Sequence, residues 1–496
     1  MAGDLELGTQ RLSIEDVERV ARRGVGVRIS APARERVAAG RARLDEMLAR
    51  GERIYGVNTG VGGNVVFSLT PEQMELLQHN LVRHLSCATG QPLPRDVVRA
   101  AVLLRVATFL TGASAVRPEV VEALAALIER GVTPVVPRYG SVGASGDLMP
   151  SAYIARVLVG MGEAELDGRL MPAEDAMKAA GLPLIRFAAK EALALINGTT
   201  MMTAVAALLW VDAFAVLRAL LGAVALSVEA LQAPSLPFER WVHEKKGHPG
   251  QIAVAAELRE ALEGSTLTQP SSGQSCYSLR CAPQGLGPVW EGFEEARPVI
   301  EREINSANDN PLIDPQTGVL YKAGNFYGGH IARVLDAWKI DFAVMGNWAN
   351  SLMAVLVDDK FNGGLPANLV PEPGVNSGFK GMQLSVTSLA CAVRQMAGPS
   401  SIHSLPTEQY NQDVVSLGMH AAVTAMDALE CLRNEVAMVL LAAAQAVDLR
   451  GGAARLGRGS RLIHEAIRRL SPVLDRDRPM EHEVAAVSAW IAAGGL

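Results

Sequence analysis

The sequence predicts a mainly α-helical fold, with a core of long helices and a smaller mixed region in the N-terminal part. Ala- and Leu-rich segments with apolar residues at three-and-four spacing recur along the chain, whereas β-prone runs such as "TPVVP" are scarce and no strand-helix alternation builds up. Apolar residues make up 49% of the 496 residues and charged residues 20%, which is typical of a globular protein with a large core.

Each expected helix follows from its own residue pattern. Residues 76–85, "LLQHNLVRHL", place Leu77, Leu81 and His84 on one face. The segment "RPEVVEALAALIERG" carries Pro118 in its first turn and Gly131 after its last turn. Further helices rich in Ala and Leu are expected at 98–112, 200–232, 329–358, 384–397 and 414–449.

Polar loops rich in Gly, Asn, Gln and Ser lie between these helices, and function tends to gather in such loops when a rigid scaffold holds them. They fall at 55–64, 137–150, 268–278, 305–310, 362–379 and 399–413. The sequence contains no internal repeat and no long linker. We therefore expect a soft division near residue 200, with residues 1–200 forming the N-terminal region and residues 201–496 the long-helix bundle.

Charge and cysteine usage argue against several kinds of partner. The net charge is -6, and the acidic and basic residues are interspersed, so no basic stripe predicts binding to nucleic acid. The cysteines are odd in number, far apart and without a Cys-x-x-Cys pair, so we expect buried thiols in a reducing compartment, neither disulfides nor a zinc site. They are Cys87, Cys276, Cys281, Cys391 and Cys431.

No metal site is expected from the histidines. His243 and His248 in "HEKKGHPG" are five residues apart and beside two lysines, so they do not share one helical face. The sequence therefore predicts a solvated turn at this segment.

Neither a signal peptide nor a membrane span is expected. The N-terminus, "MAGDLELGTQRLS", lacks a basic start followed by an apolar run. Residues 203–227 are long enough to cross a bilayer, but Asp212 and Arg218 lie inside this segment, and a helix that is apolar all round is also what a large soluble core requires. We therefore expect a buried helix and a cytoplasmic protein.

Two familiar motifs fail on their residues. A Gly-x-Ser-x-Gly elbow around Ser145 would need glycine where Asp147 stands. Gly60 and Gly62 begin like a dinucleotide-binding loop, but Val65 occupies the position of the third glycine. Neither motif therefore supplies a reactive group, and a catalytic site in this chain would need such a group from another part of the sequence.

The stretch "GSVGASGD", residues 140–147, offers that source. A glycine nitrogen can attack the carbonyl two residues earlier when nothing bulky prevents a sharp bend, and glycine is the permissive residue for such a bend. Attack of the Gly146 nitrogen on the Ala144 carbonyl, with loss of two waters, one of which carries away the Ser145 hydroxyl, gives a methylidene-imidazolone ring. This ring is a strong electrophile, and the former side-chain carbon of Ser145 becomes the atom that a nucleophile attacks.

This segment and several others resemble blocks of the ammonia-lyase and aminomutase family, which carries this self-made prosthetic group, called MIO. The blocks follow the family order over nearly the full chain. They are "YGVNTGVG" (55–62), "GSVGASGDLMP" (140–150), "ALINGT" (194–199), "QSCYSLRC" (274–281), "DNPL" (309–312), "GNF" (324–326), "GLPANL" (364–369), "NSGF" (376–379) and "NQDVVSLG" (411–418). The resemblance implies an ammonia-lyase/fumarase-like fold, no external cofactor, and a homotetramer whose active sites draw loops from several subunits.

Elimination of ammonia from an α-amino acid removes a weakly acidic β-proton while the amine departs, which requires an electrophile, a base and a carboxylate anchor. The resemblance implies that Ala144, Ser145 and Gly146 supply the electrophile and that Tyr55, in a lid loop, is the base. An unperturbed tyrosine has a pKa of about 10, so a pKa near neutrality requires roughly 4 kcal/mol of differential stabilisation. Helix N-termini aimed at the site are a physically sensible source.

The remaining site residues are also implied by the resemblance. Arg280 matches the carboxylate anchor, and its planar guanidinium suits a bidentate grip. Tyr277, counted with the catalytic residues, would face the same substrate on a helix or tight turn. Phe326 is expected beside the ring. The amides expected to hydrogen-bond the prosthetic group, the substrate amine or the carboxylate are Asn197, Gln274, Asn325, Asn411 and Gln412.

The pair His84-Leu85 indicates the substrate. In the family, His-Leu at this place accompanies tyrosine, Phe-Leu phenylalanine, and Ser-His histidine. A histidine that hydrogen-bonds a phenol would be left unpaired by phenylalanine, so discrimination built this way can reach ~10⁴. Gln412 also disfavours histidine, because histidine lyases carry Glu there. We therefore expect L-tyrosine to give trans-p-coumarate, and L-phenylalanine to give cinnamate more slowly.

Other functions stay open at this point. A 2,3-aminomutase would use the same site and re-add ammonia at the β-carbon, depending on how long the lid around Tyr55 retains the product. A histidine ammonia-lyase is a further alternative. A catalytically inactive helical scaffold, using these loops as plain turns, is the alternative outside enzymes.

Overall fold

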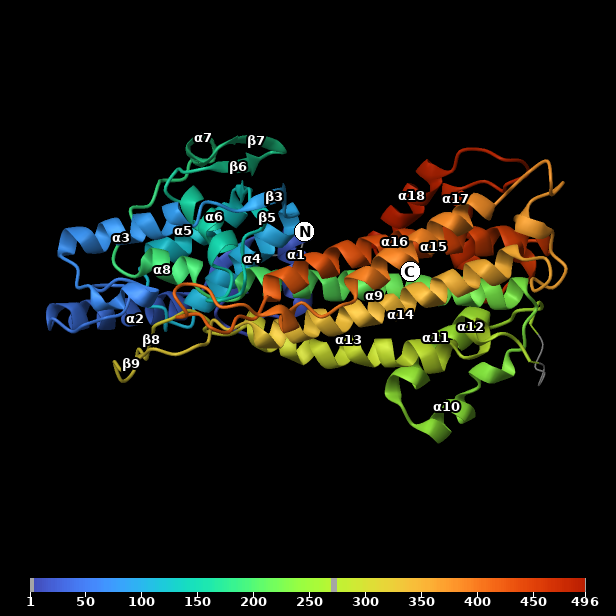
Figure 1. Cartoon of the computed structure of the whole chain (residues 1–496), viewed down its shortest axis with the longest axis horizontal. Helices are drawn as coiled ribbons and strands as arrows, with labels where there is room; N and C mark the ends of the chain where they lie inside the picture. The colour runs from blue at the N-terminus through green and yellow to red at the C-terminus, as the bar shows by residue number, and fades with distance from the viewer. Residues whose placement is uncertain (1–3, 269–273, 496) are drawn as a thin grey trace. The chain divides into compact units, whose positions relative to one another are not determined.

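The computed structural model describes residues 4–268 and 274–495, and it confirms the mainly α-helical class (Figure 1). The helices are α1 (Ile14–Arg22), α2 (Ala31–Ala49), α3 (Pro71–His84), α4 (Arg95–Phe109), α5 (Pro118–Glu129), α6 (Leu148–Val157), α7 (Ala173–Ala179), α8 (Glu191–Ile196), α9 (Thr200–Ala230), α10 (Arg240–Lys246), α11 (Pro249–Leu262), α12 (Tyr277–Arg280), α13 (Ala282–Ile304), α14 (Gly329–Val357), α15 (Lys380–Met396), α16 (Gly418–Leu449), α17 (Arg458–Leu470) and α18 (Glu481–Ala492).

Short 3₁₀ helices occur at Gly62–Val66, Leu236–Phe238, Ala367–Leu369, Ser401–His403 and Ala453–Arg455. The strands of the described residues are also short: β1 (Leu5–Leu7), β2 (Val27–Ile29), β3 (Thr89–Pro92), β4 (Thr133–Pro134), β5 (Pro137–Tyr139), β6 (Glu163–Leu166), β7 (Arg169–Pro172), β8 (Leu312–Ile313) and β9 (Leu320–Tyr321). β1 pairs with β2 in parallel, whereas β3–β5, β4–β6–β7 and β8–β9 are antiparallel.

The chain divides into two compact units. Unit 1 comprises Met1–Leu209, Arg297–Leu335 and Pro399–Val423, and unit 2 comprises Trp210–Ala296, Asp336–Gly398 and Thr424–Leu496. Hydrogen bonds hold the later segments, Arg297–Leu335 and Pro399–Val423, to the rest of unit 1. In one of them, the Leu417 N–H donates to the Val142 carbonyl at 3.0 Å.

The helices expected from periodicity are present, with ends displaced by a few residues. The segments expected at 98–112, 200–232 and 414–449 correspond to α4, α9 and α16. Helix α3 begins where Thr70 caps it in a capping box with Gln73, and it ends at His84. The local sequence pattern therefore places His84 at the C-terminal end of α3.

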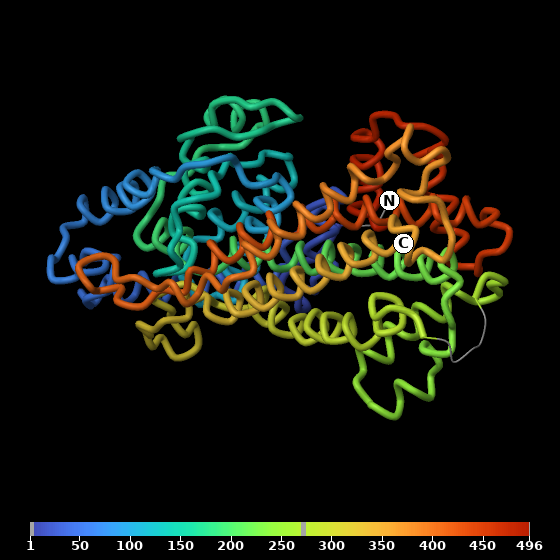
Figure 2. Tube along the Cα trace, turned by 45° about the vertical axis from the view of Figure 1, so that its right-hand side comes forward, coloured from blue at the N-terminus to red at the C-terminus, as the bar shows by residue number. Residues whose placement is uncertain are grey.

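Unit 2 is built on long helices that run side by side in both views (Figure 1, Figure 2). Aromatic rings interlock in its core: Phe214 of α9 lies 5.3 Å from Phe293 of α13, and Phe293 lies 5.7 Å from Trp338 of α14, centroid to centroid. Both contacts are edge-to-face, the geometry that aromatic quadrupoles favour. Large rings thus fill the spaces between the Ala-rich helices.

Two helices, α9 and α14, are long and apolar enough to cross a bilayer, and 72% and 44% of their most apolar windows are buried inside the protein. Core helices of soluble proteins pass the same test of length and composition. The burial expected for residues 203–227 is confirmed.

Two smaller expectations are not met in full. The cysteines are free, but Cys87, Cys276 and Cys391 are exposed and not buried. In the segment from His243, residues 244–249 are exposed as expected, but His243 itself is buried on α10, where its Nε2 contacts the Pro237 carbonyl and its Nδ1 accepts from the Gln251 amide. Tertiary packing gives this polar segment a buried side chain that its composition does not reveal.

Candidate active site

A cavity of about 570 Å³ in unit 1 brings together most of the expected site residues. They come from loops and helix ends that are far apart in the sequence. The expected residues that line it are Tyr55, His84, Leu85, Ala144, Ser145, Asn197, Phe326, Asn411 and Gln412. Gly146 adjoins the cavity as the next residue of the same loop.

The loop 140–147 bends sharply at its glycines. Gly143 and Gly146 both have φ of +73°, in the left-handed region that favours glycine. The Asp147 N–H donates to the Gly198 carbonyl at 2.7 Å, and the Gly198 N–H donates to the Ser145 carbonyl at 3.2 Å. A Cβ on Gly146 would lie 2.1 Å from the Gly198 oxygen, so a side chain at this position cannot be accommodated.

Polar side chains surround Ser145. The Asn197 amide donates to the Ser145 carbonyl at 3.4 Å, and the Gln412 amide donates to the Ser145 Oγ at 3.5 Å. The Asn197 Oδ1 is buried and has no hydrogen-bond partner in the described part of the chain, which leaves an acceptor beside the triad. The tight bend and the available amides fit a group made from Ala144, Ser145 and Gly146.

A buried arginine, Arg105, binds the backbone next to Asn197. The Arg105 guanidinium donates to the carbonyls of Ala194 (3.1 Å) and Asn197 (2.7 Å), and to the Thr200 hydroxyl (3.1 Å). Burial lowers the pKa of Arg105 to about 10, although Asp309 and Asp147 favour its charged form. Arg105 therefore fixes the backbone that presents Asn197 to the cavity.

Asp147 supports the same backbone from the other side of the triad. Its carboxylate accepts the Met202 N–H at 2.8 Å. Burial raises the pKa of Asp147 to about 7, against the lowering effects of the Met202 N–H and Arg105. Sequence reasoning used Asp147 only to reject a hydrolase motif and missed Arg105, because an arginine inside an apolar helix carries no local signal of function.

Tyr55 lies at the cavity with its hydroxyl bound to backbone. Its Oη accepts the Gly62 N–H at 2.7 Å, and Gly62 begins the 3₁₀ helix Gly62–Val66. Burial raises the pKa of Tyr55 above 10.0, the Gly62 N–H lowers it, and the Glu408 charge raises it further. The Gly62 N–H is a source of positive potential at this hydroxyl, but within the described chain it does not outweigh burial and Glu408.

His84 is positioned by the C-terminal turn of α3. Its Nδ1 lies 2.9 Å from the Asn80 carbonyl, and because a carbonyl oxygen only accepts, Nδ1 must carry the hydrogen. In the tautomer with hydrogen on Nδ1 alone, Nε2 is an acceptor. Leu85, the adjacent lining residue, is buried and apolar.

Other expected residues do not line this cavity. Asn325 is exposed and donates to the Ala307 carbonyl at 3.1 Å. Gln274, Tyr277 and Arg280 belong to unit 2. On helix α12 the Arg280 guanidinium lies 4.7 Å from the Tyr277 ring centroid, and whether both side chains face a substrate stays a prediction.

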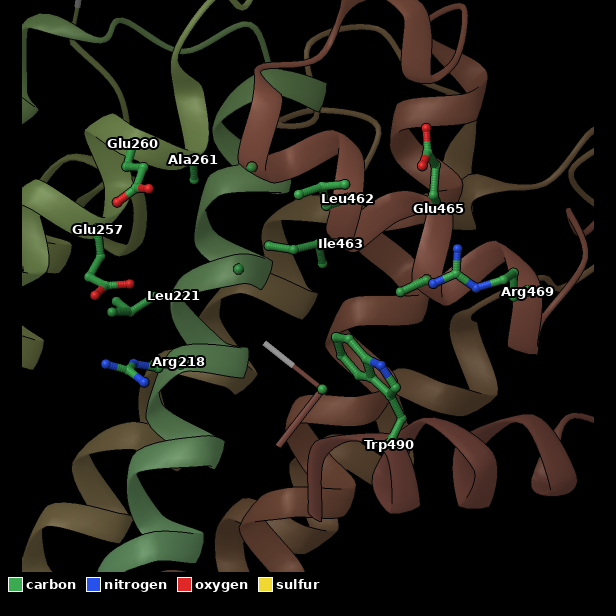
Figure 3. Close-up of a pocket in the computed structure, with 14 residues that line it drawn as sticks. Arg218, Leu221, Glu257, Glu260, Ala261, Leu462, Ile463, Glu465, Arg469 and Trp490 are labelled. Atoms are coloured by element: carbon green, nitrogen blue, oxygen red, sulfur yellow. The ribbon is translucent and has the colours of Figure 1, made fainter. Parts of the chain in front are cut away.

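A second cavity, of about 530 Å³, lies in unit 2 between α9, α11, α17 and α18 (Figure 3). Arg218, Glu257, Arg469 and Trp490 are among the residues that line it, and none of the expected site residues is. The described residues contain no group of three His, Cys, Asp or Glu side chains that could hold a metal ion. The cavity in unit 1 is therefore the candidate active site.

Comparison with known proteins relates the whole chain to a family of enzymes. The sequence model of the family described as aromatic amino acid lyase matches residues 12–469. A histidine ammonia-lyase of Sorangium cellulosum is 40% identical over 497 residues, which cover 98% of this chain and 96% of the relative.

Solved structures show the same likeness. A tyrosine aminomutase of Streptomyces globisporus superposes with a TM-score of 0.95 and 33% identity, over 99% of this chain and 97% of the other. A phenylalanine aminomutase of Pantoea agglomerans has a TM-score of 0.94 and 32% identity, over 99% of both chains. The chain therefore belongs to the aromatic amino acid lyase family, and it is an enzyme of the carbon-nitrogen lyase class.

Proposed function

We propose that the chain eliminates ammonia from an aromatic L-amino acid, with L-tyrosine as the preferred substrate and trans-p-coumarate as the product. Phenylalanine is converted to cinnamate more slowly. The observation that carries this proposal is the single cavity lined by Tyr55, His84 and Ser145. The prosthetic group is MIO, formed from Ala144, Ser145 and Gly146 without an external cofactor, and it supplies an electrophile that no ordinary side chain provides.

The chain's own residues then perform the elimination. The Tyr55 oxygen accepts the β-proton of the substrate, a double bond forms between the α- and β-carbons, and the electrons of the C–N bond leave with ammonia. The Gly62 N–H, 2.7 Å from the Tyr55 oxygen, stabilises the phenolate that this step requires. The amides of Asn197 and Gln412 hold the triad, and Asn411 lines the cavity beside them.

We also propose a cytoplasmic homotetramer in which another subunit completes each site. Tyr277 is 68% exposed, and within the described residues the two terminal nitrogens of the Arg280 guanidinium have no hydrogen-bond or ion-pair partner. A guanidinium available in this way can grip a carboxylate in bidentate fashion. The positive charge of Arg280 from another subunit would also lower the pKa of Tyr55, which burial raises. Gln274 and Asn325 are assigned to the same shared site.

The preference for tyrosine rests on His84. Its Nε2, left as an acceptor by the Nδ1–H bond to Asn80, can accept the hydrogen of a phenol hydroxyl. Phenylalanine would leave this acceptor without a partner in a closed site, at a cost of ~1–3 kcal/mol. Gln412 is uncharged and offers no counter-charge for an imidazolium substrate.

A substrate panel tests the proposal. Tyrosine, phenylalanine, histidine and dihydroxyphenylalanine are compared by the ultraviolet absorbance of the conjugated acid, with ammonia measured in parallel. We expect tyrosine to be the fastest. A clear preference for phenylalanine, or urocanate formed faster from histidine, would overturn the role given to His84.

Intact mass separates the enzyme from an inactive scaffold. We expect the purified chain to weigh less than its sequence by two water molecules, and a Ser145→Ala variant to lack both this loss and ammonia release. A parent chain of full sequence mass, or a Ser145→Ala variant with unchanged ammonia release, would overturn the assignment of MIO.

One observation favours a second candidate, a tyrosine 2,3-aminomutase: the likeness, at a TM-score of 0.95, to the tyrosine aminomutase of Streptomyces globisporus. Both reactions begin with the same proton transfer to Tyr55 and differ in whether ammonia returns to the β-carbon. Chiral chromatography of the products over time decides between them. β-Tyrosine accumulating before coumarate supports the aminomutase and contradicts the lyase.

A further inference from the structure

Lys322 brings a positive charge to the candidate base. Its Nζ lies 4.4 Å from the centroid of the Tyr55 ring, within the range of a cation–π interaction. Lys322 also lines the cavity. Among the described lining residues it is the one side chain that is cationic at neutral pH, whereas Glu408 and Asp413 are anionic.

The backbone on both sides of Lys322 is held in place. β9 (Leu320–Tyr321) pairs antiparallel with β8 and ends immediately before Lys322. The next residue, Ala323, donates its N–H to the Asn310 side chain at 2.8 Å. The hairpin and the Ala323 bond thus fix the backbone from which the exposed Lys322 side chain reaches the ring.

The charges that act on Tyr55 come from several elements. The Gly62 N–H contacts its oxygen from the 3₁₀ helix, and the Glu408 carboxylate, bound by the Gly63 N–H at 3.2 Å, raises its pKa. Of the other titratable lining residues, His84 comes from α3, Tyr327 from the loop just before α14, and Asp413 from the loop that carries Glu408. A phenolate at Tyr55 therefore lies near a carboxylate, and Lys322 is the nearby group of opposite charge.

A cation over an aromatic ring is attracted more strongly when the ring carries a negative charge. With a neutral phenol the attraction is the modest quadrupole term, but the phenolate spreads its charge over the ring carbons, so the interaction becomes one between opposite charges. Lys322 therefore interacts differently with the two protonation states of Tyr55. Only such a difference changes the proton affinity of a base.

We propose that Lys322 is a positioning residue for the reaction, whose ammonium group orients the Tyr55 ring and stabilises the deprotonated form that accepts the substrate proton. This inference rests on the proposed role of Tyr55 as the base. Lys322 acts through Tyr55 and not on the substrate bond that breaks. It also reduces the repulsion that Glu408 and Asp413 would exert on a substrate carboxylate in this cavity.

The first experiment measures kcat/KM for tyrosine against pH in the parent chain and in Lys322→Met, Lys322→Arg and Lys178→Met. Lys178 is an exposed lysine of α7 outside the cavity, and its replacement is the matched control for loss of a surface charge. We expect Lys322→Met to move the acid-side limb to higher pH by about one unit, which lowers the rate about tenfold at a fixed pH on that limb. Lys322→Arg and Lys178→Met should leave the limb in place.

The second experiment needs no turnover. In a Ser145→Ala background, alkaline ultraviolet difference spectra between chains with and without Tyr55→Phe isolate the ionisation of this phenol among seven tyrosines. The transition should occur at higher pH when Lys322→Met is added. An unmoved transition and an unmoved kinetic limb, or an equal shift in Lys322→Arg, would overturn the role of Lys322. Full activity in Tyr55→Phe would instead overturn the proposed base, while the spectra still judge whether Lys322 acts on Tyr55.

Discussion

Replacing Gly146 with alanine is expected to prevent MIO formation and to destabilise the fold. Gly146 has φ of +73°, and a Cβ built on it would lie 2.1 Å from the oxygen, 2.4 Å from the carbonyl carbon and 2.9 Å from the Cα of Gly198. All three atoms are backbone, so no side-chain rotation relieves the overlap. The chain must move apart at the point where the Ala144 carbonyl and the Gly146 nitrogen have to meet.

The cost follows from the local geometry. A left-handed φ costs a non-glycine residue roughly 1–2 kcal/mol. Separating Gly146 from Gly198 also breaks the Asp147 N–H bond to Gly198 (2.7 Å) and the Gly198 N–H bond to Ser145 (3.2 Å), each worth about 1 kcal/mol net. The free energy of unfolding should therefore fall by roughly 3–4 kcal/mol.

Gly168 provides the matched control. Its φ is +74°, and a Cβ on it would meet nothing within 4 Å, so Gly168→Ala carries the same backbone strain without the overlap. Urea unfolding of both variants in a Ser145→Ala background, where no ring forms, should show a loss of about 1–2 kcal/mol for Gly168→Ala and about 2 kcal/mol more for Gly146→Ala. With Ser145 present, intact mass should show two waters lost in Gly168→Ala and none in Gly146→Ala. Equal destabilisation of the two variants, or full water loss in Gly146→Ala, would refute the reasoning.

Three further outcomes are expected. His84→Phe should lower the tyrosine-to-phenylalanine ratio of kcat/KM by about 10²-fold, measured by initial rates, and an unchanged ratio would contradict the Nε2 acceptor. Arg105→Met should cost about 3–5 kcal/mol in urea unfolding because it leaves the buried carbonyls of Ala194 and Asn197 unpaired, so a change below 1 kcal/mol would contradict that role. Burial raises the pKa of Glu435 to about 9, and neither carboxyl oxygen has a hydrogen-bond partner among the described residues. A raised carboxyl pKa contributes stability that is full below the ordinary value of 4.5 and is lost as pH rises through about 9. The free energy of unfolding of Glu435→Gln should therefore rise relative to that of the parent chain by up to about 1.4 kcal/mol per pH unit across this window. A difference between the two chains that does not change with pH would contradict this expectation.

Much of the fold could be predicted from local pattern. Thr70, Pro71 and the three-and-four spacing after them encode α3, and the long Ala/Leu runs encode α9 and α16, because helix formation depends on neighbours three and four residues apart. The burial of His243 could not be predicted in this way. It depends on Gln251, which lies on another helix and accommodates the ring.

The features of the candidate site also fall into those that the sequence indicates and those that only the tertiary structure shows. Small residues at Ala144 and Gly146 indicated the proposed chemistry by their identity, because ring closure needs a bend that few residues permit. The unpaired amide oxygen of Asn197 and the carboxylate of Glu408 near Tyr55 became visible only in three dimensions.

The sequence by itself determined the helical class, the triad that can become an electrophile, and the residue types of the site. Only the tertiary structure decided that Tyr55, His84, Ser145 and Gln412 line one cavity, and that the Lys322 ammonium lies over the Tyr55 ring. The physical reason is range: helix periodicity and backbone permissiveness act over a few residues, whereas a cavity and its charges arise from packing between segments that lie far apart along the chain.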